Sequence, residues 1–534
     1  MGTGVFSLLT LIQANPALRP IAFLPKRSYD RGEFIAKRGH TAMILYSTRS
    51  NRHTATATQA VLKGIAPDGG LYTPISFADL KVDVGSLLNM SAVEISAEVI
   101  GKLLDDFTRD EMRAMIEAAY AGKFETDDLT PVEKVGSDFV LELFRGPTSA
   151  FKDVALSVLP RLITEAKRKL GVDEDIVILT ATSGDTGKAA LEGFHDVPGT
   201  RILVFYPDGG VSDVQKAQMV TQAGGNVGVC AVKGNFDDAQ TGVKNIFADD
   251  EQNHWAASFG ARLSSANSIN IGRLAPQVAY YFKSYCDLVL RGEIRLGEPV
   301  NFIVPTGNFG DILAGEYARR MGLPVAKLVC ASNANNVLTD FINTGVYDRR
   351  REFYKTTSPS MDILVSSNLE RYLFLASGCD YDLVSRLMAQ LREEGVYTAP
   401  QPLMDEMREH FWAGCADDRR ALEAIGEVWR RHGYLMDTHT AVAWAVMEDF
   451  KLREDNGWVN VVLSTASPYK FSRDVLSAIS DEDPESGFGA MDMLYELTKV
   501  PVPAALAALR DQPPRFNDCV ARDAMLDYVK AALK

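Results

Sequence analysis

Residues 176–194 read IVILTATSGDTGKAALEGF, which sets an apolar run, a loop of small polar residues and a helical segment in that order. The same order returns at residues 201–220, 301–321, 326–342 and 459–479. Repeated strand, loop and helix predict a parallel sheet with helices on both faces. Ligands of such sheets bind at the carboxyl ends of the strands, where these loops fall. The sequence therefore predicts an α/β fold with a ligand site along a sheet edge.

The chain of 534 residues is too long for one ordinary domain. We predict four parts: a poorly ordered N-terminal extension at 1–42, an α-rich domain at 43–134, an α/β region of two lobes at 135–500, and a helical tail at 501–534. The smaller lobe is expected at roughly 155–275, and residues 376–456 are expected to be helical. Whether residues 1–42 belong to the mature protein stays open.

Charge and cysteine usage narrow the class of protein. The net charge of -14 argues against a general nucleic-acid binder and against a protein of the membrane surface. The six cysteines are far apart and have no metal-ligand spacing, which predicts free thiols, no metal site and a cytoplasmic location. No apolar run reaches the roughly 18 residues of a membrane span. A short apolar run near the N-terminus leaves a signal peptide open.

Two loops are suited to anions. Residues 306–311, TGNFGD, follow an apolar strand and open a helix, so their amides can approach a phosphate; a tight turn capped by Asp311 is the alternative. Residues 182–187, TSGDTG, lie in the same context and offer hydroxyls and amides to a second anion. A nucleotide P-loop would need glycine at 182 and serine or threonine at 189, where the chain has Thr182 and Ala189.

Lys152 lies in LELFRGPTSAFKDVALSV, residues 141–158, where a loop becomes an apolar helix. Burial lowers the pKa of a lysine, so Lys152 is either inert in a pair with Asp153 or a nucleophilic amine. Residues 464–471, STASPYKF, place two hydroxyls at the end of another strand. His439 is expected to orient backbone rather than to take part in catalysis.

A lysine at a helix start, two anion loops and a hydroxyl pair fit one cofactor. An aldehyde with one phosphate, bound to the lysine amine beside an amino-acid carboxylate, is pyridoxal phosphate.

The motifs resemble those of threonine synthases, of the pyridoxal-phosphate fold type II shared with the tryptophan synthase β-subunit. They are collinear from Tyr46 to Phe471. They read YSTRS (46–50), GIAPDGGLYTP (64–74), LFRGPTSAFKD (143–153), TATSGDTGKAALEGF (180–194), GNFDDAQTGVK (234–244), NSINIGRLAPQVAYYF (267–282), VPTGNFGDILAG (304–315), SPSMDILVSSNLER (358–371) and STASPYKF (464–471).

The resemblance implies a role for each motif. Lys152 would bind the cofactor aldehyde covalently, and Thr465 would face the pyridine nitrogen. The cofactor phosphate would be cradled by Gly307, Asn308, Phe309, Gly310 and Asp311. The substrate carboxylate and the ring oxygen would be served by Ser183, Gly184, Asp185, Thr186 and Gly187. Candidates for the substrate phosphate are Arg371, Lys470 and Arg145, and a salt bridge with Glu370 is the alternative for Arg371.

The activity implied is conversion of O-phospho-L-homoserine and water to L-threonine and phosphate by a monomer or homodimer, with no nucleic-acid or membrane partner. Another pyridoxal-phosphate lyase that forms a 2-oxo acid is an alternative. Many members of the family have histidine where this chain has Arg145. A guanidinium does not shuttle protons near pH 7, so a relative that holds the cofactor without turnover also stays open.

Overall fold

The computed structural model describes residues 42–248, 255–454 and 456–533. Residues 43–534 cluster as one compact unit. The predicted extension at 1–42 lies outside the described residues except for its last residue. The further boundaries at 134 and 500 remain predictions. In the part of the chain that the structure describes, no helix combines the length and apolar character needed to cross a membrane.

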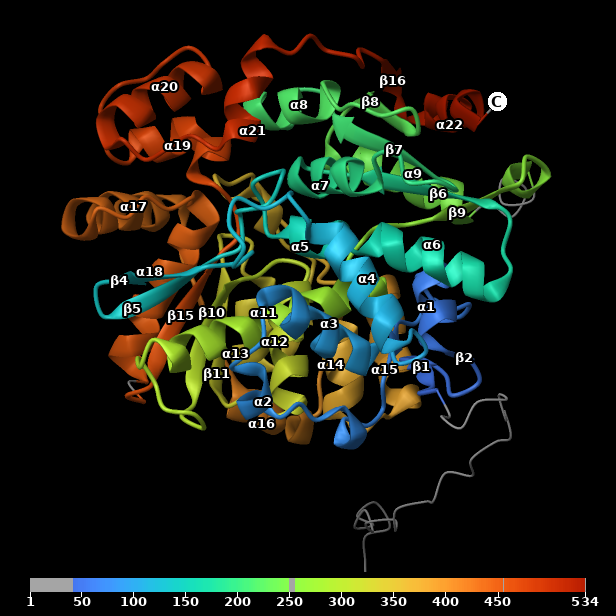
Figure 1. Cartoon of the computed structure of the whole chain (residues 1–534), viewed down its shortest axis with the longest axis horizontal. Coiled ribbons are helices and arrows are strands. Elements are labelled where there is room, and N and C mark those ends of the chain that lie inside the picture. The colour runs from blue at the N-terminus through green and yellow to red at the C-terminus, as the bar shows by residue number, and fades with distance from the viewer. Residues whose placement is uncertain (1–41, 249–254, 455, 534) are drawn as a thin grey trace, which may run out of the picture. The chain divides into compact units, whose positions relative to one another are not determined.

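The larger sheet has six strands in the order β14-β11-β10-β15-β5-β4 (Figure 1). All neighbours are parallel except β4 and β5. The strands are β4 (Val132–Val135), β5 (Asp138–Glu142), β10 (Val300–Pro305), β11 (Val325–Ser332), β14 (Phe411–Cys415) and β15 (Val459–Ser464).

Helices cover both faces of this sheet because successive strand residues point to opposite sides. Phe302 and Val304 pack with α11 (Ile271–Leu290) and α12 (Gly310–Arg320). Ile303, between them, packs on the other side with α17 (Asp418–His432) and α18 (Thr438–Arg453). The predicted strands and helices of residues 301–342 are therefore confirmed.

The smaller sheet has five parallel strands in the order β16-β8-β7-β6-β9. They are β6 (Asp175–Ala181), β7 (Thr200–Pro207), β8 (Val227–Lys233), β9 (Ala261–Ser264) and β16 (Cys519–Ala521). One face meets α6 (Leu159–Leu170), α7 (Asp185–Phe194) and α8 (Asp213–Val220). The other meets α9 (Phe236–Ala248) and α22 (Met525–Leu533). The tail thus adds a strand and a helix to the smaller sheet.

The N-terminal region carries a three-stranded antiparallel sheet of β1 (Leu45–Ser47), β2 (Thr54–Ala55) and β3 (Tyr72–Thr73). Its helices are α1 (Ala57–Lys63), α2 (Val84–Leu87), α3 (Ala92–Leu103) and α4 (Arg109–Tyr120). Capping boxes begin α1, α3 and α4, where Thr56, Ser91 and Thr108 each pair with an acid or amide three residues on. Helix α3 packs against α11, which joins this region to the larger sheet.

The prediction of a wholly helical segment at 376–456 is wrong. The segment contains α15 (Tyr381–Glu393), α16 (Gln401–His410), α17 and α18, but also β13 (Val396–Thr398) and the edge strand β14. The remaining elements are α5 (Lys152–Leu156), α13 (Val337–Thr344), β12 (Val346–Asp348), α14 (Leu369–Ala376), α19 (Ser472–Ser477), α20 (Gly487–Thr498), α21 (Ala504–Ala507) and the 3-10 turns η1 (Ala78–Leu80), η2 (Pro359–Met361), η3 (Pro468–Phe471), η4 (Ala508–Asp511) and η5 (Arg522–Ala524).

Candidate functional site

Lys152 is the first residue of α5, at the end of a loop that follows β5. The loop is bonded to the segment after β15: Phe151 N donates to Thr465 O at 2.9 Å, and Ser467 N donates to Ser149 O at 3.1 Å. These bonds place Lys152 at the carboxyl ends of the central strands, as the sequence predicts for the ligand site. The Lys152 side chain is buried.

The Lys152 amine lies 3.5 Å from Asp185 Oδ2 and 3.5 Å from Ser360 Oγ. Burial lowers the pKa of Lys152 to about 8; the carboxylate of Asp185 opposes this shift, and the charges of Arg273 and Lys470 add to it. An amine with this pKa has a substantial neutral fraction slightly above neutral pH, and that fraction can act as nucleophile or base. The surroundings therefore favour the reactive form of Lys152.

Asp153 does not pair with Lys152 but holds the loop before it. Its carboxylate accepts from Thr148 N at 2.8 Å and from Thr148 Oγ1 at 2.5 Å. Burial raises the pKa of Asp153 to about 6, although the bonds from Thr148 act in the opposite direction. A Cβ atom added at Gly146 would lie 2.6 Å from the Asp153 side chain, so glycine is required for this close approach.

The raised pKa of Asp153 predicts how the free energy of unfolding changes with pH. Its folded pKa of about 6 is above the ordinary value, so its contribution to stability is fully present below the unfolded pKa and is lost as pH rises through about 6. Between about pH 5 and about pH 7 the wild type is expected to lose about 1 kcal/mol through this group. Asp153→Asn should lose less over the same interval, measured by urea unfolding. An equal loss in both proteins would contradict the assignment.

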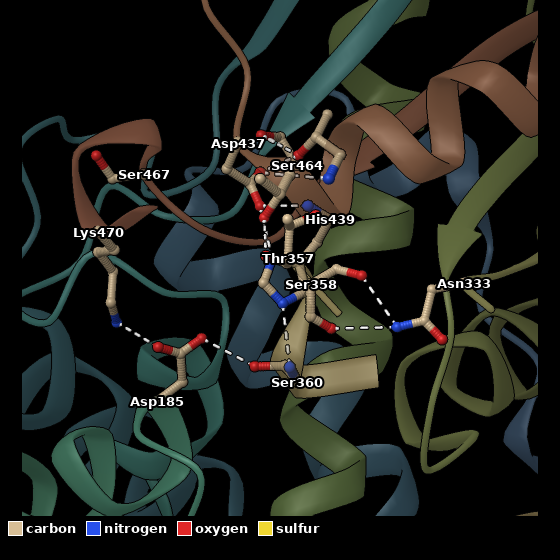
Figure 2. Close-up of polar contacts among 12 residues, drawn as sticks. Asp185, Asn333, Thr357, Ser358, Ser360, Asp437, His439, Ser464, Ser467 and Lys470 are labelled. Atoms are coloured by element: carbon tan, nitrogen blue, oxygen red, sulfur yellow. Dashed lines mark hydrogen bonds and ion pairs between the residues drawn. The ribbon is translucent and has the colours of Figure 1, made fainter. Parts of the chain in front are cut away.

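Asp185 is the centre of a charged cluster (Figure 2). Its Oδ1 accepts from Lys470 Nζ at 2.7 Å and from Gln215 Nε2 at 2.9 Å, and its Oδ2 accepts from Ser360 Oγ at 3.2 Å. Burial opposes ionisation, but the charges of Lys470 and Lys152 hold the pKa of Asp185 well below its ordinary value. The predicted residues Lys152, Asp185 and Lys470 therefore meet around one ionised carboxylate.

The loop 182–187 turns sharply into α7. Thr182 Oγ1 accepts from Gly184 N at 3.0 Å and from Gly187 N at 2.8 Å. Gly184 has a φ of +130°, and a Cβ atom there would lie 2.5 Å from the Gln215 side chain. Because the Asp185 oxygens already serve cations and hydroxyls, the partly exposed hydroxyls of Ser183 and Thr186 suit a substrate carboxylate better than Asp185 does.

The turn 307–311 joins β10 to α12 and is suited to a phosphate. Phe309 has a φ of +62°, and the first helical bond is made by Leu313 N to Phe309 O at 3.1 Å, so the preceding amides are not used within the helix. A Cβ atom on Gly307 would lie 3.1 Å from Ser360 O. The turn therefore packs directly on the segment that contains Ser360, whose hydroxyl contacts Lys152.

The side chain of Asp311 is buried and is held by two tyrosines. Its Oδ1 accepts from Tyr280 at 2.5 Å and from Tyr281 at 3.0 Å, and burial raises the pKa of Asp311 to about 6. The hydrogen bonds from the two tyrosines occupy Oδ1 of this carboxyl, and a carboxylate offers no donor to a phosphate. The predicted cradle is thus expected to act through its main-chain amides.

Arg371 lies behind this turn, fully buried. Its guanidinium donates to Tyr72 O at 3.0 Å, to Asn368 Oδ1 at 2.6 Å and to Ile269 O at 2.5 Å. Asn368 N in turn donates to Asn308 O at 3.1 Å. With all three nitrogens in use, Arg371 is better suited to support the turn than to contact a substrate phosphate. Its predicted salt bridge with Glu370 is replaced by a pair between Arg49 and Glu370 at 2.8 Å.

Arg145 is held by two carboxylates, Glu142 at 2.6 Å and Glu125 at 3.0 Å. Because these two carboxylates compensate its charge, the Arg145 guanidinium is not free to bind an anion. His439 contacts backbone, as the sequence predicts: its Nε2 accepts from Ser360 N at 3.2 Å (Figure 2).

Sequence reasoning missed Ser360, Gln215 and Arg273. Arg273 is buried, its NH1 donates to Ala266 O at 2.8 Å, and its Nε has no partner in the described part of the chain. Burial lowers the pKa of Arg273 to about 10. A lone arginine on the apolar start of α11, with no acid three or four residues away, is a signal that could have identified it.

The residues fit a phosphorylated aldehyde. Among residues 42–248, 255–454 and 456–533, the site combines a buried amine of lowered pKa, a turn whose amides are not used within helix α12 and an arginine nitrogen without a partner. The Thr465 hydroxyl is buried in the segment bonded to the Lys152 loop, where it can meet a ring nitrogen.

Comparisons with known proteins agree with this geometry. Residues 45–120 match the family described as threonine synthase N terminus, residues 132–465 match that of pyridoxal-phosphate dependent enzymes, and residues 440–532 match that of the threonine synthase C-terminal region.

Among curated proteins, threonine synthase-like 1 of Pongo abelii is 39% identical over 79% of this chain, and the chain spans only 58% of that relative. The threonine synthase of Eremothecium gossypii is 37% identical over 83% of this chain and 90% of its own length. The crystal structure of threonine synthase from Brucella melitensis with bound PLP superposes with a TM-score of 0.81 and 36% identity, covering 92% of this chain and all of its own. With three family matches that lie between residues 45 and 532, and a threonine synthase structure that is 36% identical and matched over its whole length, the chain belongs to the threonine synthase family of pyridoxal-phosphate dependent, fold type II enzymes.

Proposed function

We propose that this protein is a threonine synthase, a lyase that converts O-phospho-L-homoserine and water to L-threonine and phosphate with pyridoxal 5′-phosphate as cofactor. The observation that carries the proposal is the buried Lys152 amine, which contacts Ser360 and whose charge acts on Asp311 of the turn 307–311. An amine of this kind suits both covalent attachment of an aldehyde and proton transfer.

Each part of the cofactor has residues that would hold it. The amides of residues 307–311 would hold the phosphate, Lys152 the aldehyde carbon, and Thr465 the ring nitrogen. When bound, pyridoxal phosphate withdraws electrons from the substrate through the substrate nitrogen, which makes its Cα and Cβ protons acidic.

Lys152 then moves the protons. With substrate bound, the free Nζ would remove the Cα proton and later a Cβ proton, and the γ-phosphate would leave as a double bond forms between Cβ and Cγ. The proton taken from Cβ would then be delivered to Cγ, water would add at Cβ, and Nζ would return a proton to Cα, so the protons lost from Cα and Cβ are balanced by those gained at Cα and Cγ. Lys470 keeps Asp185 ionised, so the carboxylate can hold the ammonium of Lys152 between transfers.

We assign the substrate phosphate to Arg273 rather than to Arg371. Arg273 has an unpaired nitrogen in a buried position, and its charge is close enough to lower the pKa of Lys152. A buried guanidinium with an unused donor is suited to a phosphate dianion.

Arg273→Met is expected to lower kcat/KM for O-phospho-L-homoserine by about 10- to 100-fold, the value of one charge-assisted hydrogen bond. Steady-state kinetics measure this effect. Arg371→Met is the matched control, and it should chiefly lower the free energy of unfolding because it leaves three buried acceptors without donors. A normal kcat/KM in folded Arg273→Met would remove Arg273 from the phosphate site.

Purified protein loaded with pyridoxal phosphate should be assayed with O-phospho-L-homoserine for threonine, phosphate and 2-oxobutyrate together. Threonine and phosphate in equal amounts are expected. Phosphate with 2-oxobutyrate instead would identify another lyase, and the absence of all three would identify a relative that binds the cofactor without turnover. A cytoplasmic location and a monomer or homodimer remain predictions.

A further inference from the structure

The Ser360 hydroxyl lies between two groups of the site. Its Oγ is 3.2 Å from Asp185 Oδ2 and 3.5 Å from Lys152 Nζ. Ser360 is in the short turn η2, and it comes more than 200 residues after Lys152 in the chain. Figure 2 shows Ser360 in contact with Asp185, which also contacts Lys470.

The direction of each hydrogen bond follows from charge. Asp185 is ionised because Lys470 and Gln215 donate to its Oδ1, and an ionised carboxylate only accepts. Ser360 Oγ therefore donates its hydrogen to Asp185. Its lone pairs are then available to Lys152, whose nitrogen must be the donor in that contact.

The backbone of Ser360 is held from two sides. Its N–H donates to His439 Nε2 at 3.2 Å, which requires the hydrogen of the neutral ring to be on Nδ1, and Nδ1 is 2.8 Å from Asp437 Oδ1. On the other side, Ser360 O lies 3.1 Å from the position of a Cβ on Gly307, against the phosphate turn. The hydroxyl is therefore placed by both neighbours.

We propose that Ser360 is a positioning residue for the Lys152 amine. Ser360 Oγ and Asp185 Oδ2 accept the two N–H bonds of the neutral amine, and the fourth tetrahedral direction, which holds the lone pair, then points away from both acceptors. The lone pair is thus presented to the substrate instead of to Asp185. The proposal rests on the proposed function only in taking Lys152 as the reacting amine.

The test uses the full-length protein freed of its cofactor. Competitive acetylation of Lys152 across a pH series, followed by mass spectrometry, gives the pKa of the amine without any turnover. Ser360→Ala removes an acceptor of the ammonium, so the pKa is expected to fall by about half a unit. Ser360→Thr keeps the hydroxyl and should restore the wild-type value.

Ser358→Ala is the matched control, because it deletes a hydroxyl of the same segment that accepts from Asn333 at 3.0 Å. It should leave the pKa of Lys152 unchanged. If Ser360→Ala fails to fold, Ser360→Cys, whose sulfur is a weak acceptor, should give a smaller fall.

In the loaded enzyme, Ser360→Ala should lower kcat by about tenfold with little change in KM, since Ser360 orients the base and does not bind substrate. An unchanged pKa in Ser360→Ala, or an equal shift in Ser358→Ala, would overturn the proposal. Because labelling needs no substrate, these outcomes are separate from the failure of threonine synthesis itself.

Discussion

Lys152→Ala is expected to lower kcat for threonine formation by about 10⁴-fold or more, because it removes both the covalent attachment and the base. The neighbouring groups cannot take over. Lys470 is committed to Asp185 at 2.7 Å and to Thr148 O at 3.1 Å. His439 Nε2 is occupied by Ser360 N. Release of threonine and phosphate in single- and multiple-turnover assays measures the loss.

The variant should still fold, because Asp185 keeps Lys470 and Gln215 as partners. Lys188→Ala is the matched control: Lys188 is another buried lysine, on helix α7, which packs against α5, and it pairs with Glu192 at 3.2 Å. This control should keep most of the wild-type kcat. Equal losses in the two variants would mean that Lys152 is not the reacting amine.

The elements that sequence predicts well are those whose pattern is local. Each of the predicted strands at 176, 201, 301, 326 and 459 is an apolar run that ends in a glycine-containing or small polar loop, and each is present. Strand β14 is only five residues long between two helices, so its periodicity is too short to separate it from them. Strand β16 has three residues and pairs with β8, nearly 290 residues earlier, so its formation depends on tertiary contact.

The site divides in the same way. Lys152 and the two loops lie in continuous motifs next to strands, where spacing alone indicates an anion site. Ser360 and Asp185 are 175 residues apart in the sequence, so no local sequence pattern predicts their contact. The resemblance implies that Asp185 binds substrate. In the structure its carboxylate accepts hydrogen bonds from Lys470, Gln215 and Ser360. Which charges surround Asp185 could therefore be determined only from the fold.

Because Asp185 pairs with a buried lysine, its substitution has the largest effect that we expect on the free energy of unfolding. Lys470 is fully buried, and Asp185 is the carboxylate 2.7 Å from its amine. Asp185→Asn leaves the buried Lys470 ammonium without its ion-pair partner, which is expected to lower the free energy of unfolding by about 3–5 kcal/mol. Urea unfolding of the cofactor-free protein measures this loss independently of activity.

A double-mutant cycle separates the ion pair from other effects of the substitution. Lys470→Met removes the buried charge and leaves Asp185 with Lys152, Gln215 and Ser360, so Asp185→Asn should cost much less in that background. The double variant is therefore expected to be more stable than Asp185→Asn alone. If the two losses were simply additive, Lys470 would not be the partner that keeps Asp185 ionised, and the charge arrangement assigned to Lys152 would need a different source.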